Sequence, residues 1–242
     1  MTVAVIIQAR TGSTRLPGKV MKRLMDRTVL GHVITRCLAM PLVEKVIIAT
    51  TALAEDDVIC REAENYGVSY YRGSTEDVLS RYYEAAQVVE ANTIVRITSD
   101  CPLLDPNISN AVVEKFLQKK CDYMSTGLSG TFPRGLDTEV FSFAALELAY
   151  QKAVLPYEKE HVTPYLYLHP ELFQLEAYHN ELNQSQYRLT LDTEEDWELI
   201  STVYSRLYSG EVFELPSVLE LFKNEPALPL INEAVRQKKL GE

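Results

Sequence analysis

Two periodicities alternate along the first 125 residues of this 242-residue chain. Five short apolar runs are typical of strands covered on both faces; they are residues 3–7, 46–49, 68–71, 94–97 and 121–124. Four segments between them have helical spacing or helix end signals; they are residues 29–40, 56–66, 76–90 and 106–117. Strands joined by crossover helices form parallel sheets with helices on both faces. The alternation therefore predicts an α/β fold with a mainly parallel sheet.

The second half of the chain is less regular. Its expected elements are strands at residues 136–143, 172–177 and 187–191, a helix at 158–168 interrupted by Pro164, and a helix at 193–208. No linker or repeat divides the chain, so we expect a single domain over residues 1–242. In this interpretation residues 130–185 form an inserted lobe. Aromatic side chains there predict a homodimer surface; they are Phe132, Tyr165, Tyr167 and Phe173.

The net charge argues against several classes of partner. Lys and Arg number 24 against 34 Asp and Glu, which makes the net charge −10. Such an acidic chain is not expected to bind nucleic acid or an anionic membrane broadly. No run approaches the ~20 apolar residues that span a bilayer, and the N-terminus has no signal-peptide pattern, so we expect a cytoplasmic protein. The four cysteines have no CxxC spacing, which argues against a zinc site.

A basic loop follows the first predicted strand directly. Residues 8–19 read QARTGSTRLPGK, with glycines at positions 12 and 18 and the cations Arg10, Arg15 and Lys19. Glycines let backbone N–H groups turn toward an anion. Arg grips phosphate oxygens in pairs and Lys adds a point charge. The spacing is neither that of a Walker A loop nor GxGxxG, so the pattern predicts a different nucleotide-phosphate loop, with a solvated basic turn as the alternative.

Two aspartates follow predicted strands. Asp100 and Asp192 come just past residues 94–97 and 187–191, respectively. Ligands of open α/β sheets bind beyond the carboxyl ends of the strands, and carboxylates there can hold a divalent metal against phosphate. We expect the two aspartates to share Mg²⁺; the alternative for Asp192 is a helix cap. Asp105 is expected to cap the next helix.

A polar segment containing a glycine occupies residues 132–141, FPRGLDTEVF. Asp137 and Glu139 face the same side if this segment is extended, with Arg134 close by in sequence. These side chains form either an exposed strand face or a polar wall for a sugar, and the spacing does not separate the two. His161 lies in a dense polar cluster, although a structural or surface role is the default for a lone histidine.

Taken together, these segments resemble a known family. IIQARTGSTRLPGK resembles the opening motif of the cytidylyltransferases that make CMP-activated acidic sugars, such as the Kdo and sialic-acid activating enzymes. The chain is more similar to the spore-coat polysaccharide cytidylyltransferase-like group. That likeness rests on further segments in the same order, which are RGSTEDVLSRYYEAA, SDCPLLDP, PRGLDTEVFS, EHVTPY and LTLDTEEDW. The resemblance spans roughly residues 3–208.

The resemblance implies a nucleotide-diphospho-sugar transferase (GT-A-like) fold with CTP and an acidic sugar as partners and Mg²⁺ as cofactor. The implied nucleotide site consists of Ala9, Arg10, Gly12, Ser13, Arg15, Lys19, Arg72, Gly73, Ser74, Asp77 and Ser99. Arg10, Lys19 and Asp100 would act in catalysis. Asp100 and Asp192 would bind the metal. The residues implied to face the sugar are Arg134, Asp137, Glu139 and His161. Residues 130–185 would then form the lobe for acceptor binding and dimerisation.

The implied reaction is nucleotidyl transfer. A hydroxyl of an acidic 2-keto sugar would attack the α-phosphorus of CTP, giving a CMP-sugar and pyrophosphate for surface polysaccharide or glycan synthesis. Two alternatives stay open. A glycosyltransferase would consume a nucleotide sugar, although residues 99–101 read SDC rather than a DxD metal motif. A nucleotide-binding regulator would bind without turnover.

Overall fold

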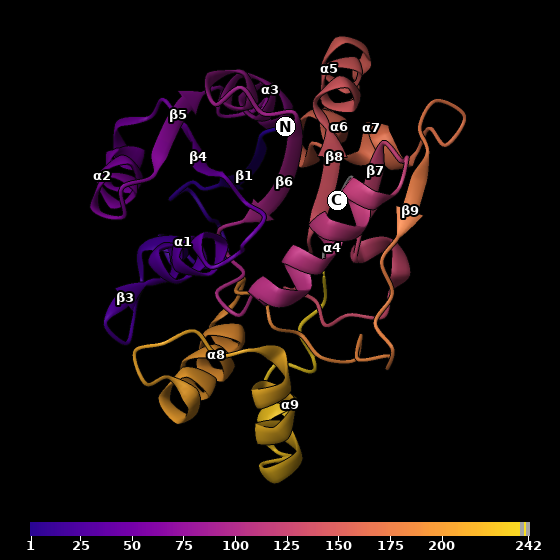
Figure 1. Ribbon diagram of the computed structural model, residues 1–242. Helices are drawn as coiled ribbons and strands as arrows, with labels where there is room; N and C mark the ends of the chain where they lie inside the picture. The colour runs from indigo at the N-terminus through magenta and orange to yellow at the C-terminus, as the bar shows by residue number, and fades with distance from the viewer. Residues whose placement is uncertain (238–239, 241–242) are drawn as a thin grey trace.

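The computed structural model describes residues 1–237 and 240. Seven strands form one sheet in the order β5-β4-β1-β6-β8-β7-β9 (Figure 1). Their bounds are β1 Val3–Gln8, β4 Lys45–Thr51, β5 Ser69–Gly73, β6 Thr93–Thr98, β7 Tyr123–Ser125, β8 Glu139–Ser142 and β9 Leu175–Ala177. Of these seven, β8 alone runs antiparallel to its neighbours, β6 and β7. The prediction of a mainly parallel sheet is therefore confirmed.

Strand β1 lies inside the parallel part of the sheet, between β4 and β6. Val3, Val5 and Ile7 join one hydrophobic core, whereas Ala4 and Ile6 join another. Successive side chains of a strand point to opposite faces. A strand covered on both faces therefore has to be apolar throughout, which explains the unbroken apolar run at the start of the chain.

Helices cover both faces of the sheet. Their bounds are α1 Val29–Leu38, α2 Asp57–Asn65, α3 Val78–Val88, α4 Pro106–Gln118, α5 Phe143–Lys152, α6 Pro156–His161, α7 Pro164–Tyr167, α8 Glu194–Leu207 and α9 Leu215–Asn224. Apolar side chains of α1, α2 and α4 join the core on one face, and those of α3 and α5 join the core on the other (Figure 1). Within the described residues, none of these helices is long and apolar enough to cross a membrane.

A third hydrophobic core lies under α8 and α9. It includes Leu16 from the basic loop, Leu103 from the segment after β6, and Leu189 and Leu191 from the segment before α8. Three stretches that are distant in sequence are thereby packed together. Each of them carries a candidate site residue, so this core positions the site. The remaining elements are the hairpin β2 Arg23–Leu24 and β3 Arg27–Thr28, and the 3-10 helices η1 Lys19–Met21, η2 Ala54–Asp56, η3 Gly127–Ser129 and η4 Leu228–Leu230.

One sequence expectation about secondary structure is wrong, and a second is confirmed with narrower bounds. Residues 187–191 form no strand and contribute a single isolated bridge, Arg134 to Arg188. Their apolar alternation reflects the burial of Leu189 and Leu191 in the third core rather than pairing in a sheet. The strand expected at 136–143 is shorter, and helix α5 begins at Phe143 because the Ser142 side chain accepts the backbone N–H of Ala145 at 3.1 Å.

The segment 130–185 contributes β8 and β9 to the same sheet as β1. Phe132 and Phe173 are buried, and Tyr165 and Tyr167 are half-buried against the core beneath α3 and α5. Phe132 and Phe173 are therefore not available to a partner subunit, whereas Tyr165 and Tyr167 keep part of their surface exposed, and a dimer surface in this segment stays a prediction. The single domain over residues 1–242, the inserted lobe and the homodimer itself stay predictions.

Candidate active site

A cavity of about 590 Å³ lies beyond the carboxyl ends of β1 and β6. Its size falls within the ~300–1,000 Å³ range of small-molecule sites, and its position agrees with the ligand-binding edge of α/β sheets. The cavity brings together most residues that the sequence singled out; they are Ala9, Arg10, Gly12, Ser13, Arg15, Lys19, Ser99, Asp100, Arg134, Asp137, Glu139, His161 and Asp192.

Lys19 joins the two aspartates that were predicted to bind metal. The loop turns at Gly18, whose φ of 64° is in the left-handed region that favours glycine. This turn delivers Lys19 to the cavity wall with only 9% of the residue exposed. Its Nζ donates to Asp100 Oδ2 at 2.7 Å and to Asp192 Oδ1 at 2.8 Å. A third hydrogen bond, to the Leu191 carbonyl at 2.8 Å, uses the remaining donor of the ammonium group.

We call Lys19, Asp100 and Asp192 the acid–lysine triad. Burial alone would lower the pKa of Lys19, but the two carboxylates outweigh it, and the pKa is raised above its ordinary value. Burial alone would raise the pKa values of Asp100 and Asp192. Lys19 outweighs burial there as well, so both values lie below the ordinary value. All three groups therefore carry their charges at neutral pH.

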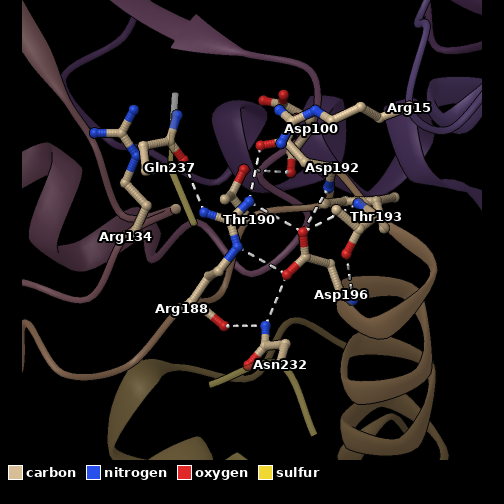
Figure 2. A network of polar contacts seen from close by, with 12 residues as sticks. Arg15, Asp100, Arg134, Arg188, Thr190, Asp192, Thr193, Asp196, Asn232 and Gln237 are labelled. Carbon is tan, nitrogen blue, oxygen red and sulfur yellow. Dashed lines mark hydrogen bonds and ion pairs between the residues drawn. The ribbon is translucent and has the colours of Figure 1, made fainter. Parts of the chain in front are cut away.

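Asp192 is held from its other side by a network that sequence reasoning missed (Figure 2). Arg188 donates to Asp192 Oδ2 at 2.9 Å and to both carboxylate oxygens of Asp196 at 2.8 and 3.0 Å. Asp196 is fully buried and also accepts a hydrogen bond from Asn232 at 2.8 Å. Arg188 therefore orients the second oxygen of Asp192 while Lys19 holds the first. The available signal was an arginine four residues before the aspartate.

Helix α8 does not use Asp192 as its cap. The Thr193 side chain accepts the backbone N–H of Asp196 at 3.3 Å and caps the helix instead. This excludes the alternative in which Asp192 serves only as a cap. The prediction for Asp105 is confirmed, since its side chain accepts the backbone N–H groups of Asn107 and Ile108 at 2.9 and 3.1 Å.

The basic loop is anchored at one end and presents cations along its length. Thr11 donates its backbone N–H and its hydroxyl to Asp56 Oδ1 at 2.8 and 2.7 Å, which ties the loop to the segment after β4. Arg15 pairs with Asp192 Oδ1 at 3.0 Å. Arg10 is exposed, lines the cavity and forms no ion pair with any residue in the described part of the chain. The loop can therefore offer positive charge to an anion.

Glu139, at the other end of the cavity, is satisfied within the protein. It accepts hydrogen bonds from Arg96 at 2.5 Å, Tyr123 at 2.7 Å and Thr163 at 3.0 Å. The side chains of Glu139 and Arg96 are only 13% and 14% exposed, so their charges largely cancel beneath the cavity surface. Glu139 therefore lines the cavity and also binds a buried cation, and its part in a sugar site stays a prediction.

Arg134 is the loosely held cation at this end, which we call the acceptor end after the role predicted for it from the sequence. The acceptor end consists of Arg134, Asp137, Glu139 and His161. The Arg134 side chain is 51% exposed and lies 3.6 Å from Asp137. A second hollow of about 260 Å³ shares Arg134, Asp137, Glu139 and Tyr167 with the main cavity. His161 lines the main cavity, and burial lowers its pKa, which favours the neutral imidazole at neutral pH.

Residues 72–77 lie outside the cavity wall as far as the described chain shows. The Arg72 guanidinium donates to the carbonyls of Thr51 and Leu53 at 3.0 and 2.8 Å, and it pairs with Asp57 at 2.7 Å. These three contacts turn Arg72 toward η2 and α2, away from the position that the resemblance implied.

The other residues of this stretch are used locally. Asp77 caps α3 by accepting the Ser80 N–H at 2.8 Å, and the Ser74 hydroxyl accepts the Asp77 N–H at 3.0 Å. Gly73 ends β5. The cavity is lined instead by Arg81, one helical turn after Asp77. Its sequence signal was a cation on the otherwise apolar buried face of α3.

The carboxylates of the site can supply part of the coordination of a magnesium ion, and a bound ligand would supply the rest. Within residues 1–237 and 240, no group of three or more His, Cys, Asp and Glu side chains could hold a metal ion. Asp100 and Asp192 supply two hard carboxylate donors at the cavity, both of them bonded to Lys19. Mg²⁺ in phosphate-binding sites is commonly held by one or two carboxylates, with substrate phosphates and water completing its coordination. The residues therefore fit a magnesium ion bound with a polyphosphate.

This parallel α/β sheet, with a cationic loop and two carboxylates at one end of its cavity, is the arrangement of a nucleotidyltransferase. The family model described as cytidylyltransferase matches residues 4–221. The chain belongs to the cytidylyltransferase family, which confirms the predicted family and enzyme class.

Individual relatives agree with this membership. An uncharacterised protein of Methanocaldococcus jannaschii is 37% identical over 100% of this chain and 99% of its own length. The spore coat polysaccharide biosynthesis protein SpsF of Bacillus subtilis is 30% identical over 95% of this chain and 97% of its own length. The 3-deoxy-manno-octulosonate cytidylyltransferase of Trichlorobacter lovleyi is 35% identical, but over 48% of this chain and 46% of its own length.

Solved structures confirm the fold. A cytidylyltransferase from Leptospira borgpetersenii superposes with a TM-score of 0.91 at 37% identity, covering 99% of this chain and 100% of that chain. CMP:2-keto-3-deoxy-manno-octonic acid synthetase, solved in complex with CTP, superposes with a TM-score of 0.65 at 16% identity, covering 85% and 99% of the two chains. At that identity the second likeness concerns the fold alone.

Proposed function

We propose that this protein transfers the CMP group of CTP to a hydroxyl of an acidic 2-keto sugar and releases pyrophosphate. The observation that carries the proposal is the acid–lysine triad, which lies in one cavity with the cationic loop. The names of two relatives support the substrate class, because one refers to a polysaccharide and the other to the 2-keto sugar acid 3-deoxy-manno-octulosonate.

The reaction needs positioning and charge rather than a covalent enzyme intermediate. The acceptor oxygen forms a bond to the α-phosphorus and its proton passes to solvent water, while the bond from this phosphorus to the bridging oxygen breaks and pyrophosphate takes the electron pair. Arg10, Arg15 and Lys19 offset the negative charge of the phosphates. The lowered pKa values of Asp100 and Asp192 make these carboxylates weak proton acceptors, which favours cation binding as their role.

Mg²⁺ belongs to this proposal, with Asp100 and Asp192 as its protein ligands. When bound, the ion would neutralise phosphate charge. The surrounding charges suit its arrival with a nucleotide, since the cations Arg15, Lys19 and Arg188 balance Asp100, Asp192 and Asp196. Mn²⁺ paramagnetic resonance in the presence of CTP tests the ligands without turnover. Asp100→Asn and Asp192→Asn should each weaken Mn²⁺ binding, and unchanged binding would remove both residues from the metal site.

Arg134 supports an acidic acceptor. Arg96, the other arginine at the acceptor end, is bonded to Glu139, and His161 is neutral at neutral pH. Arg134 has only the 3.6 Å contact with Asp137 and a half-exposed guanidinium, so it can turn to a carboxylate of the ligand. Guanidinium groups bind carboxylates through two parallel hydrogen bonds.

Pyrophosphate release tests the function. The protein is incubated with CTP, Mg²⁺ and a panel of 2-keto sugar acids, each paired with a neutral sugar of the same carbon skeleton. We expect release only with acids. Arg134→Gln should raise KM for the acid by about 10-fold, the loss of one charge-assisted contact, and leave CTP affinity unchanged. Release with neutral sugars alone, or silence across the panel without CTP binding by calorimetry, overturns the proposal.

The same assay separates the two alternatives. A glycosyltransferase would release a nucleoside diphosphate from a nucleotide sugar and no pyrophosphate from CTP. A regulator would bind CTP, form no product with any acceptor, and retain nearly full CTP affinity in the Asp100→Asn variant. Light scattering at micromolar protein concentration tests the homodimer, which would be excluded by a monomeric mass.

A further inference from the structure

Arg81 is a buried cation without a protein partner for most of its donors. The residue is 2% exposed, and its Nε and Nη1 have no hydrogen-bond partner among the described residues. Leaving donors of a charged group buried and unsatisfied is costly. The same side chain lines the cavity. A buried arginine that lines a cavity with donors unused is suited to bind a ligand.

The surroundings of Arg81 do not satisfy it. Asp56 is close enough to influence its pKa, but that carboxylate accepts hydrogen bonds from Thr11 and Thr51. Asp77 is also nearby, and its side chain caps α3 and lies 3.4 Å from Lys159. Both carboxylates therefore bond to other groups. Their negative charge lowers the free-energy cost of burying Arg81, although neither forms a hydrogen bond with it.

Gly73 lies against the stem of the Arg81 side chain. A Cβ atom at this position would lie 2.8 Å from Arg81 Cγ and 3.0 Å from a ring carbon of Tyr71. Any larger residue would have to displace the arginine stem. The close approach fixes the arginine stem against the end of β5. Arg81 lines the cavity, as do Ala9 and Val78.

Arg81 and the acid–lysine triad enter the cavity from different sides. Arg81 belongs to α3, whereas Asp192 lies two residues before the start of α8, and Figure 1 shows these two helices on opposite sides of the molecule. The basic loop already supplies the cations Arg15 and Lys19 where a triphosphate would be held. Arg81 lines the same cavity from α3, as does the apolar Val78, and is therefore placed for the other end of the nucleotide, which is the base.

We propose that Arg81 recognises the cytosine ring of CTP by donating two N–H groups to O2 and N3. Both atoms are acceptors and lie side by side on the ring. The N–H groups along either edge of a guanidinium are spaced for such a pair of acceptors. Uracil carries a donor at N3, so the same contact would place two donors against each other. Arg81 therefore selects CTP over UTP. This inference rests on the proposed function only in that CTP is the nucleotide.

Calorimetric titration of the full chain with CTP, UTP and 3-deazacytidine triphosphate tests the proposal. The last probe replaces the N3 acceptor by C–H and needs no change in the protein. A good two-point contact to a base discriminates by about 5- to 150-fold. We expect wild-type protein to prefer CTP over both other nucleotides by a factor in this range.

Two variants complete the test. Arg81→Gln should bring the affinities for CTP, UTP and the 3-deaza analogue to within about threefold of one another, because the two-point contact is gone. Arg15→Gln is the matched control, a cavity arginine at the triad end, and should weaken CTP and UTP by the same factor. Retention of the wild-type preference in Arg81→Gln overturns the proposal. So does an equal loss of CTP, UTP and pyrophosphate affinity, which would make Arg81 a phosphate ligand.

If Arg81→Gln does not fold, wild-type protein alone still tests the proposal, because it must discriminate against the 3-deaza analogue. Equal wild-type affinity for CTP and that analogue refutes it. The outcome is distinct from failure of the proposed function, in which CTP does not bind or no sugar acid releases pyrophosphate.

Discussion

The two ends of the cavity hold their charges in different ways. At the triad end, two ionised carboxylates share one ammonium group that lines the cavity, and Arg15 and Arg188 join the same cluster. At the acceptor end, Glu139 is bonded to Arg96 and two hydroxyl groups, and the loosely held cation is Arg134. At the triad end, charged groups line the cavity where they can contact a charged ligand. At the acceptor end, most of the charged groups are paired with one another in the cavity wall. Changes at the first end should affect the reaction, and changes at the second should affect the choice of acceptor.

The largest effect is expected from Lys19→Met, which breaks the triad. Removing one preorganised charge from such a site typically costs about 100- to 1,000-fold in rate. The variant also leaves Asp100 and Asp192 without their shared cation, and breaking a buried pair costs about 3–5 kcal/mol of folding free energy. Kinetics of pyrophosphate release and urea denaturation measure the two losses.

Lys22→Met provides the control, because the Lys22 ammonium lies 3.6 Å from the exposed carboxylate of Glu194. A surface pair of this kind contributes less than about 1 kcal/mol. If Lys19→Met and Lys22→Met behave alike, the triad is not the centre of the reaction.

Arg188→Met should have the next largest effect, through Asp192. The change leaves the fully buried Asp196 carboxylate without its cation, at a cost of about 3 kcal/mol of folding free energy. It also frees one oxygen of Asp192, and loss of an outer-shell partner lowers activity by about 10- to 100-fold. Arg206→Met, which removes the exposed pair with Glu225, should change stability by less than about 1 kcal/mol. Full activity in Arg188→Met would show that Asp192 keeps its orientation unaided.

Glu139→Gln should separate the two ends of the cavity. The change keeps the shape but removes the charge that Arg96 faces, which costs about 1–3 kcal/mol of stability. We expect a higher KM for the acceptor, since the wall of the acceptor end shifts, and a CTP affinity within about twofold of wild type. Glu176→Gln, at the half-exposed pair with Lys119, serves as the control. A large loss of CTP affinity in Glu139→Gln would mean that the two ends are not independent.

The smallest expected effect is the change of the free energy of unfolding with pH, which is absent near neutrality and appears only in acid or base. The lowered pKa of Asp192 stabilises the fold above the ordinary value of 3.8, and this contribution is lost as pH falls through the folded-state pKa. The raised pKa of Lys19 stabilises the fold below its ordinary 10.5, and that contribution is lost as pH rises through the folded-state value. The stability difference between wild type and Asp192→Asn should therefore be constant near neutrality and shrink in acid. A difference that grows on acidification contradicts the sign of the shift.

Parts of this site were predictable from local sequence. Glycines and cations after an apolar strand predict an anion-binding loop wherever they occur, because the backbone conformation and the charge are both local. The position of Asp100 just past a predicted strand is also a local feature. It predicted that Asp100 lies at the ligand-binding edge of the sheet. Arg81 and Arg188 were missed because their roles depend on what lies opposite them across the fold. The contacts of Arg72 with the carbonyls of Thr51 and Leu53 were not predicted either, because they also join segments that are distant in sequence.

The sequence by itself determined the α/β class, the parallel core strands and the cationic loop, because periodicity and glycine chemistry act over a few residues. Only the tertiary structure decided that residues 187–191 are not a strand, that Lys19 bonds Asp100 and Asp192 at once, and that Glu139 is neutralised by Arg96. Those outcomes depend on contacts between segments up to 173 positions apart. Burial and pairing of charges are properties of such contacts, and no local pattern in the chain specifies them.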